Sequence, residues 1–162
     1  MHNPLVSRTE YLPSFSLCGH SFQMSMSQSE NAVLCASFWK KFNQALTANR
    51  LAQSGHWKKY ALTYSDGADY RYFCGIPAPA ATPPGFQMMQ IPASHYLVFE
   101  HRGSTRGIAK TLSDIYRHYL PNSHYQHERS IFIHFERYDH RFRWNHAESL
   151  IEICLPIFLD ES

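Results

Sequence analysis

The 162-residue sequence lacks the local signatures of most catalytic and cofactor-binding proteins. It contains no HExxH or CxxC metal motif, no GxSxG nucleophile motif and no glycine-rich phosphate loop. Its histidines, including His124 and His127, have no cysteine pair beside them. We therefore expect no metal site, no cofactor and no catalytic residue, and we interpret the chain as a protein that is not an enzyme.

Long hydrophobic runs and a strong net charge are also missing. No apolar stretch approaches the roughly 20 residues that cross a bilayer, so we expect no membrane contact. With no visible secretory signal and no CxxC among the four cysteines, we expect a cytoplasmic protein with reduced thiols. The formal net charge of +2 is too small to indicate direct nucleic-acid binding.

Aromatic residues, by contrast, are abundant. Eleven Phe, ten Tyr and three Trp make up 15% of the chain. Such rings serve a core, an interface or a ligand pocket, and core packing is the ordinary role of any single ring. Over a bound cation, each aromatic face contributes about 0.5–2 kcal/mol. The composition therefore permits an aromatic binding site without requiring one.

The sequence also contains a long internal repeat. Pro13 and Pro92 lie 79 positions apart, as do Pro77 and Pro156. Between these marks, apolar periodicities predict the order strand, helix, strand, strand twice. A unit of this size exceeds the roughly 20–50 residues of solenoid repeats. We predict an α+β fold of two βαββ units about a pseudo-twofold axis, with an antiparallel sheet and a ligand cleft between the halves.

The repeat sets the expected domain boundaries. Residues 1–11 are expected to be loose, and 12–158 to form one domain with halves at about 12–77 and 91–157 and a proline-rich linker at 77–86. The predicted elements are strand 14–26, a helix from 31 to about 52 capped by Ser27 or Ser29, strands 57–64 and 68–76 joined by an Asp66-Gly67 turn, a strand centred on 94–100, helix 105–119, and strands 130–138 and 150–158.

Two glutamates are candidates for an acid in the cleft. Strand alternation places Glu136 on the same face as His134 and Tyr138. If that face lines the cleft, a carboxylate among aromatic rings suits a cationic or amine-bearing guest. Otherwise Glu136 faces solvent and pairs with a base. Glu152 is the rival acid, on the face opposite its isoleucine neighbours, and it lies either on a polar outer face or in a covered cleft.

Several stretches, taken in order, resemble the GyrI-like family, the effector-binding domain of AraC-type transcription regulators. The likeness covers about residues 12–158 and is carried by Phe38-Trp39-Lys40-Lys41-Phe42, Tyr70-Arg71-Tyr72-Phe73-Cys74-Gly75, the stretch 91–103, Ile115-Tyr116 through Leu120-Pro121, Phe135-Glu136-Arg137-Tyr138, and the stretch 151–157. The resemblance implies a cleft that binds small hydrophobic molecules, often cationic drugs. It implies Glu136 as the central acid and Trp39, Tyr60 and Tyr72 as aromatic liners.

These observations favour a stand-alone module that binds a hydrophobic cationic or amphipathic ligand. Because the resemblance begins about twelve residues into the sequence, we expect no helix-turn-helix domain, so a role in transcription regulation or drug sensing needs a partner. One alternative is a protein-binding inhibitor that docks on a topoisomerase or a regulator. Another is a hydrolase of strained electrophilic compounds with Glu136 as general base. We expect a monomer or a homodimer.

Overall fold

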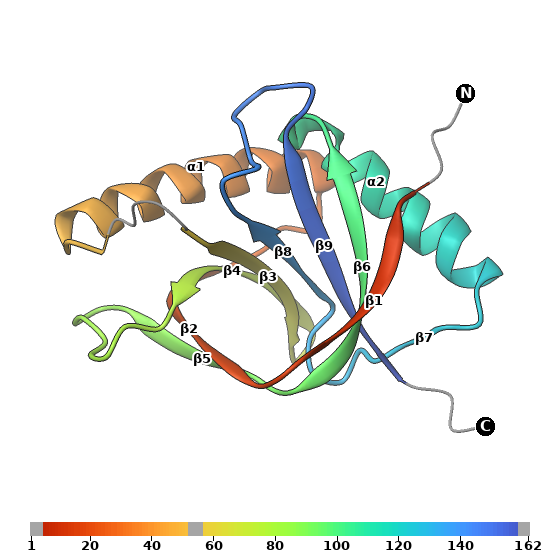
Figure 1. Ribbon diagram of the computed structural model, residues 1–162. Helices are drawn as coiled ribbons and strands as arrows, with labels where there is room; N and C mark the ends of the chain where they lie inside the picture. The colour runs from red at the N-terminus through yellow and green to blue at the C-terminus, as the bar shows by residue number, and fades with distance from the viewer. Residues whose placement is uncertain (1–4, 52–56, 159–162) are drawn as a thin grey trace.

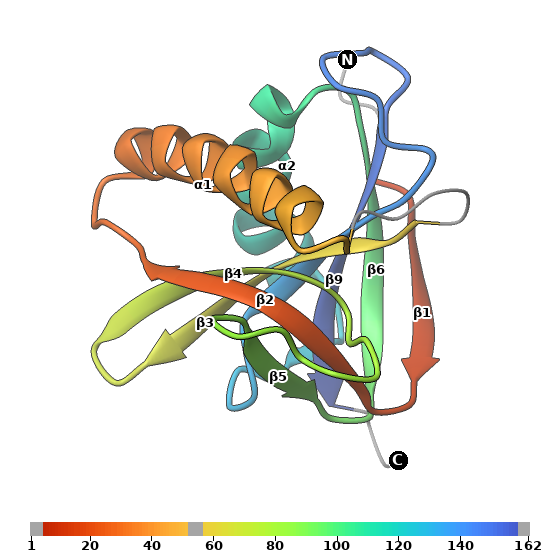
Figure 2. The same cartoon turned by 90° about the vertical axis from the view of Figure 1, so that its left-hand side faces the viewer.

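The computed structural model describes residues 5–51 and 57–158. Within them, one curled antiparallel sheet carries both helices on the same face (Figures 1 and 2). The sheet has nine strands in the order β1-β6-β9-β8-β3-β4-β2-β5, with β7 paired to β9. The fold is therefore α+β, built on a half-barrel sheet. No helix in this part of the chain is long and apolar enough to cross a membrane.

Each predicted half is present in the predicted order. The first half contains β2 (Phe15–Gln23), α1 (Gln28–Ala48), β3 (Lys59–Asp66) and β4 (Asp69–Pro77). The second contains β6 (Ser94–Arg102), α2 (Ile108–Asp114) with a π-helical continuation at Ile115–Tyr119, β8 (His134–Tyr138) and β9 (Leu150–Phe158). The additional strands, which the sequence patterns did not separate, are β1 (Ser7–Leu12), β5 (Gln87–Ile91) and β7 (Gln126–His127).

The additional strands β1 and β5 connect the two halves. β1 precedes the first half but pairs with β6 of the second, whereas β5 precedes the second half and pairs with β2 of the first. The prediction that residues 1–11 are loose is wrong for residues 7–11, because their backbone groups are paired along β6. Residues 1–4 lie outside the described part of the chain.

Helix α1 begins and ends at identifiable signals. The Ser27 side chain accepts a hydrogen bond from the backbone N–H of Glu30 at 3.3 Å, as predicted for a serine cap. At the other end Arg50 has a left-handed φ of 56°, and the Leu51 N–H reaches the Leu46 carbonyl at 2.8 Å. The helix therefore stops at Ala48, before the predicted end near residue 52, which lies outside the described residues.

The hairpin of the first half also follows the prediction. Gly67 occupies the turn between β3 and β4 with φ at 65°, a conformation that favours glycine. Strand β8 is shorter than the predicted 130–138, since it starts only at His134. The segment before it turns instead, with the Ser130 N–H bonded to the Glu128 carboxylate at 2.9 Å.

The sheet buries apolar side chains on both faces. On the face away from the helices, Leu17 and Ile91 from one end of the sheet pack in one cluster with Tyr96 and Val98 from the other end. The curl of the sheet brings these strands together. On the helix face, α1 packs over the first half and the Ile115 turn over the second. Glu136 lies on this helix face, where the two halves meet at β3 and β8.

Candidate ligand-binding site

Glu136 is a buried acid on the central strand β8. Its residue is 7% exposed. It pairs with Ala61 of β3 on one side and Ile153 of β9 on the other. Because directly opposed residues of an antiparallel pair share a face, its neighbours within the sheet are apolar. The sequence alternative in which Glu136 faces solvent is therefore wrong.

Aromatic side chains with polar tips surround the carboxylate. The Tyr138 hydroxyl donates a hydrogen bond to Glu136 Oε2 at 2.9 Å. The Trp39 indole N–H, from α1, donates to the Tyr72 hydroxyl at 2.8 Å. Trp39 also packs edge-on against Tyr138, with ring centroids 5.4 Å apart, and the ring of Phe142 packs against Tyr138 with centroids 5.1 Å apart. The acid thus lies among aromatic rings contributed by both halves.

The surroundings of Glu136 shift the pKa of its carboxyl group towards neutral pH. Burial raises the pKa of Glu136 to about 7, and hydrogen bonds from the hydroxyls of Tyr138 and Tyr72 act in the opposite direction. Among the described residues, none of the ion pairs includes Glu136. A buried carboxylate without a cation is costly, and an incoming positive charge would relieve that cost.

Three of the four predicted site residues come together. Glu136, Trp39 and Tyr72 lie on the helix face of the sheet. Tyr60 does not join them: it pairs with Arg137 and packs in the cluster on the opposite face, against Phe135 at 5.8 Å between ring centroids. The prediction that Tyr60 lines a cleft around Glu136 is wrong for this structure, because successive residues of a strand point to opposite faces.

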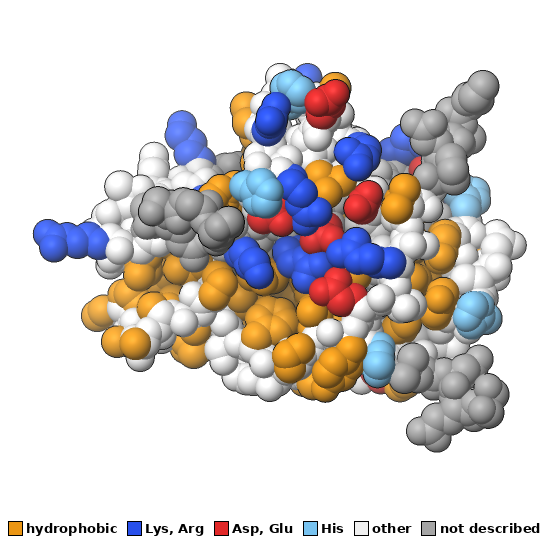
Figure 3. Space-filling view, in the orientation of Figure 1, with side chains coloured by type: hydrophobic (Ala, Val, Ile, Leu, Met, Phe, Trp, Pro, Cys, Tyr) orange, Lys and Arg blue, Asp and Glu red, His pale blue; other side chains and the backbone are white. Residues whose placement is uncertain are grey.

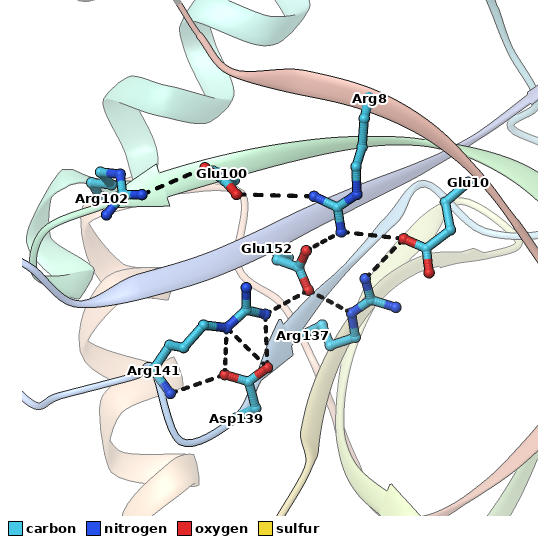
Figure 4. A network of polar contacts seen from close by, with 8 residues as sticks. All are labelled: Arg8, Glu10, Glu100, Arg102, Arg137, Asp139, Arg141 and Glu152. Carbon is cyan, nitrogen blue, oxygen red and sulfur yellow. Dashed lines mark hydrogen bonds and ion pairs between the residues drawn. The ribbon is translucent and has the colours of Figure 1, made fainter.

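Glu152, the rival acid, has very different surroundings (Figure 4). It is 2% exposed and lies on the face away from the helices, opposite Arg137 in the sheet. Arg137 Nε donates to it at 2.9 Å and Arg141 at 3.0 Å, and Arg8 of β1 also donates to it. Burial raises its pKa, but the guanidinium groups of Arg137 and Arg8 more than compensate and leave the pKa of Glu152 below its ordinary value.

The same network continues to the surface. Glu10 accepts from Arg8 and Arg137, each at 3.2 Å, and Asp139 holds Arg141 at 2.7 Å. Figure 4 shows these side chains together, and Figure 3 shows basic and acidic side chains gathered at the centre of one face, with hydrophobic side chains beside them. Each carboxylate in the group has a cation partner. Glu152 therefore has its charge balanced within the protein, and Glu136 is the candidate acid for a ligand.

Two residues of the candidate site, Tyr138 and Phe142, were not among the predicted ligand-binding residues. Tyr138 contacts the carboxylate directly, and strand alternation already placed it on the Glu136 face. Phe142 comes from the loop after β8, and no pattern in the sequence connects this loop with Glu136. Within the part of the chain that the structure describes, no group of three or more His, Cys, Asp or Glu side chains is arranged to hold a metal.

Residues 7–157 match the GyrI-like small molecule binding domain. The chain belongs to the GyrI-like family. The match covers both halves, including the strand β1 that the sequence patterns had left outside the domain.

Individual relatives extend the comparison. The transcriptional regulator BrlR of Pseudomonas aeruginosa is 31% identical over 93 residues, which cover 56% of this chain but only 34% of BrlR. The structure of SAV2435 bound to tetraphenylphosphonium has a TM-score of 0.72 at 18% identity and covers 94% of each chain. EcmrR in its complex with DNA has a TM-score of 0.66 at 14% identity, covering 94% of this chain and 57% of EcmrR. At these identities the two solved structures establish the shared fold.

Proposed function

We propose that this GyrI-like protein binds hydrophobic cationic or amphipathic molecules, with Glu136 as the charge that pairs with the ligand. The observation that carries the proposal is a carboxylate 7% exposed, surrounded by aromatic rings and without an ion pair among the described residues. Apolar burial and ring contacts supply affinity, and the acid selects for positive charge. The binding of tetraphenylphosphonium by the structural relative SAV2435 supports this choice of ligand class.

The proposal includes a site shared by two related halves. Gly19 pairs with Gly75, and the positions 79 later, Val98 and Cys154, also pair. This equal register supports a pseudo-twofold axis between β3 and β8, with the ligand cleft over it on the helix face. Glu136 is buried, so we further propose that a ligand enters by displacing side chains of the cover, which includes Trp39 and Phe142.

The proposed activity is binding without turnover. The groups that hydrogen-bond to the Glu136 carboxylate are the hydroxyls of Tyr138 and Tyr72, which orient it. We further propose that the module acts in drug sensing or transcription regulation together with a partner protein, in keeping with its likeness to part of BrlR. Recovery of the ligand unchanged after prolonged incubation, checked by mass spectrometry, tests the first of these statements.

Isothermal titration calorimetry with two ions of similar shape and opposite charge tests the binding proposal. Tetraphenylphosphonium should bind, and tetraphenylborate should not. The Glu136→Gln variant keeps the size of the side chain and should weaken tetraphenylphosphonium binding about 30-fold or more, which corresponds to at least about 2 kcal/mol. Exposed Glu148 provides the matched control, since Glu148→Gln should leave binding unchanged. Equal binding of both ions, or full affinity in Glu136→Gln, would overturn the proposal.

A further inference from the structure

His134 is a second buried polar side chain on the helix face of β8. It is 6% exposed and lies two residues before Glu136, so the two side chains leave the strand on one face about 7 Å apart. Their partners on β3 are short: Thr63 pairs with His134 and Ala61 with Glu136. The two polar groups therefore have small side chains between them and β4.

Within the described residues, the protein holds one of the two ring nitrogens of His134. Nδ1 lies 2.7 Å from the hydroxyl of Tyr116, which belongs to the π-helical turn Ile115–Tyr119. Nε2 has no hydrogen-bond partner among the described residues. Every fully inaccessible side-chain nitrogen or oxygen in the same part of the chain has a partner, so Nε2 retains some accessible surface. Nε2 therefore keeps an unused hydrogen-bonding position on the helix face.

The contact with Tyr116 determines which proton His134 offers. The Tyr116 hydroxyl has no other acceptor among the described residues, so donation to Nδ1 is the one way in which this part of the chain satisfies its proton. Burial lowers the pKa of His134 to about 4, so the ring is neutral at physiological pH and carries its single proton on Nε2. The accessible nitrogen is then a hydrogen-bond donor.

Tyr116 also connects His134 with the acid. Burial raises the pKa of the Tyr116 hydroxyl, and the charge of Glu136 adds to this effect. Tyr116 and Glu136 therefore share one electrostatic environment beneath the helical cover of the second half. A ligand whose charge lies at Glu136 brings its neighbouring atoms within reach of the same region.

Building on the function proposed above, we propose that His134 is a second anchor of this site and donates its Nε2–H to an oxygen of the ligand. The ligand class is thereby narrowed to amphipathic cations with a carbonyl, ether or hydroxyl oxygen about 7 Å from the charged atom, the spacing of two residues along one strand face. Tyr116 is a positioning residue, because it sets the tautomer of His134 and makes no contact with the ligand oxygen. A ligand with an oxygen at this distance can accept the hydrogen bond from His134 Nε2–H, whereas a purely hydrocarbon cation cannot.

Two matched cations test this inference. Hexyltriphenylphosphonium has only hydrocarbon around its charge, and its 5-oxohexyl analogue adds a ketone oxygen at the required separation. Because one neutral hydrogen bond changes affinity by about fivefold, the ketone should bind about fivefold more tightly to the wild-type protein by calorimetry. In His134→Phe the ratio of the two affinities should fall to about one. Glu136→Gln should weaken the binding of both cations and leave that ratio unchanged.

The outcomes separate the two proposals. If both cations bind with equal affinity, cation binding stands and the His134 anchor fails. If neither cation binds, the binding proposal itself fails, together with the anchor that rests on it. A fivefold preference that persists in His134→Phe would also overturn the anchor, since the ketone would then be recognised elsewhere.

A measurement on the unaltered protein covers the case in which His134→Phe does not fold. With ¹⁵N-labelled histidine, NMR should show His134 as the Nε2–H tautomer in the free protein. The Nε2 resonance should shift when the ketone binds and change much less with the hexyl analogue. A Tyr116→Phe variant should retain binding and show a mixture of tautomers. An Nδ1–H tautomer in the wild type, or equal shifts with both ligands, would contradict the inference.

Discussion

Glu136 and Glu152 lie on neighbouring strands and are both almost fully buried, at 7% and 2% exposure, yet the side chains that hydrogen-bond to them are neutral in one case and cationic in the other. Glu152 faces away from the helices and receives hydrogen bonds from three arginines. Glu136 faces the helices and has tyrosine hydroxyls around it. One acid is kept charged by the protein, and the other has its pKa raised to about 7.

The difference teaches that burial alone does not indicate the role of an acid. A buried charge is tolerated when the fold supplies its counterions, as at Glu152, where residues from β1, β8 and the following loop converge. When the fold supplies only hydroxyls, part of the desolvation cost stays uncompensated. Such a site is available to a ligand cation, so the acid with weaker support is the better candidate for function.

The largest expected loss of stability comes from removing the charge of Glu152, which the arginines around it balance. Glu152→Gln leaves Arg137, whose side chain is 13% exposed, without its buried carboxylate. We expect a loss of roughly 3–5 kcal/mol in the free energy of unfolding, measured by urea denaturation near neutral pH. Exposed Glu148→Gln is the control and should be nearly neutral. A loss below about 1 kcal/mol would show that the network is not a buried, balanced unit.

Replacing Glu136 by glutamine should change the free energy of unfolding in the opposite direction. Its folded-state pKa of about 7 lies above the ordinary value of 4.5, so its ionisation disfavours the folded state as pH rises between these values. Glu136→Gln should therefore be more stable than wild type by roughly 2–3 kcal/mol near pH 8 and about equally stable near pH 4. Denaturation curves at both pH values check this. A stability difference that does not depend on pH would contradict the raised pKa.

These contrasts also show what the sequence could and could not predict. Local periodicity was sufficient for α1, for the β3–β4 hairpin and for the order of elements in each half, because these patterns lie within one continuous segment. Strand β1 was missed because its residues are mostly polar and its stability comes from pairing with β6, far away in the sequence. Only long-range register reveals such a strand.

The candidate site, like the fold, could be predicted where its residues lie within one continuous segment. Alternation along β8 correctly placed Glu136 beside His134 and Tyr138. It could not decide which face of β3 meets Glu136, and Tyr60, which the family resemblance implied as a cleft liner, lies on the opposite face. Strand alternation alone left Glu152 as a rival to Glu136, since the arginines around Glu152 converge only in the folded chain.

A smaller effect should come from the hydroxyl groups that support Glu136. Tyr138→Phe removes the 2.9 Å hydrogen bond to the carboxylate, and because this bond lowers the acid's pKa, the variant should raise it above about 7. The loss of unfolding free energy should be about 1 kcal/mol. An NMR titration of the Glu136 carboxyl carbon checks the pKa. Tyr70→Phe, at an exposed tyrosine of β4, is the control, and an unchanged Glu136 titration in Tyr138→Phe would contradict the assigned bond.

The smallest effect should come from the exposed rim of the Glu152 network. Glu10 accepts from Arg8 and Arg137 at the same distance of 3.2 Å, but its side chain is 31% exposed, against 3% for Glu152. We therefore expect Glu10→Gln to cost only about 0–1 kcal/mol, and less at high salt, because water and ions screen exposed pairs. Urea denaturation at low and high salt measures this. A cost comparable to that of Glu152→Gln would mean that the number of arginine contacts, and not burial, decides the stability of this network.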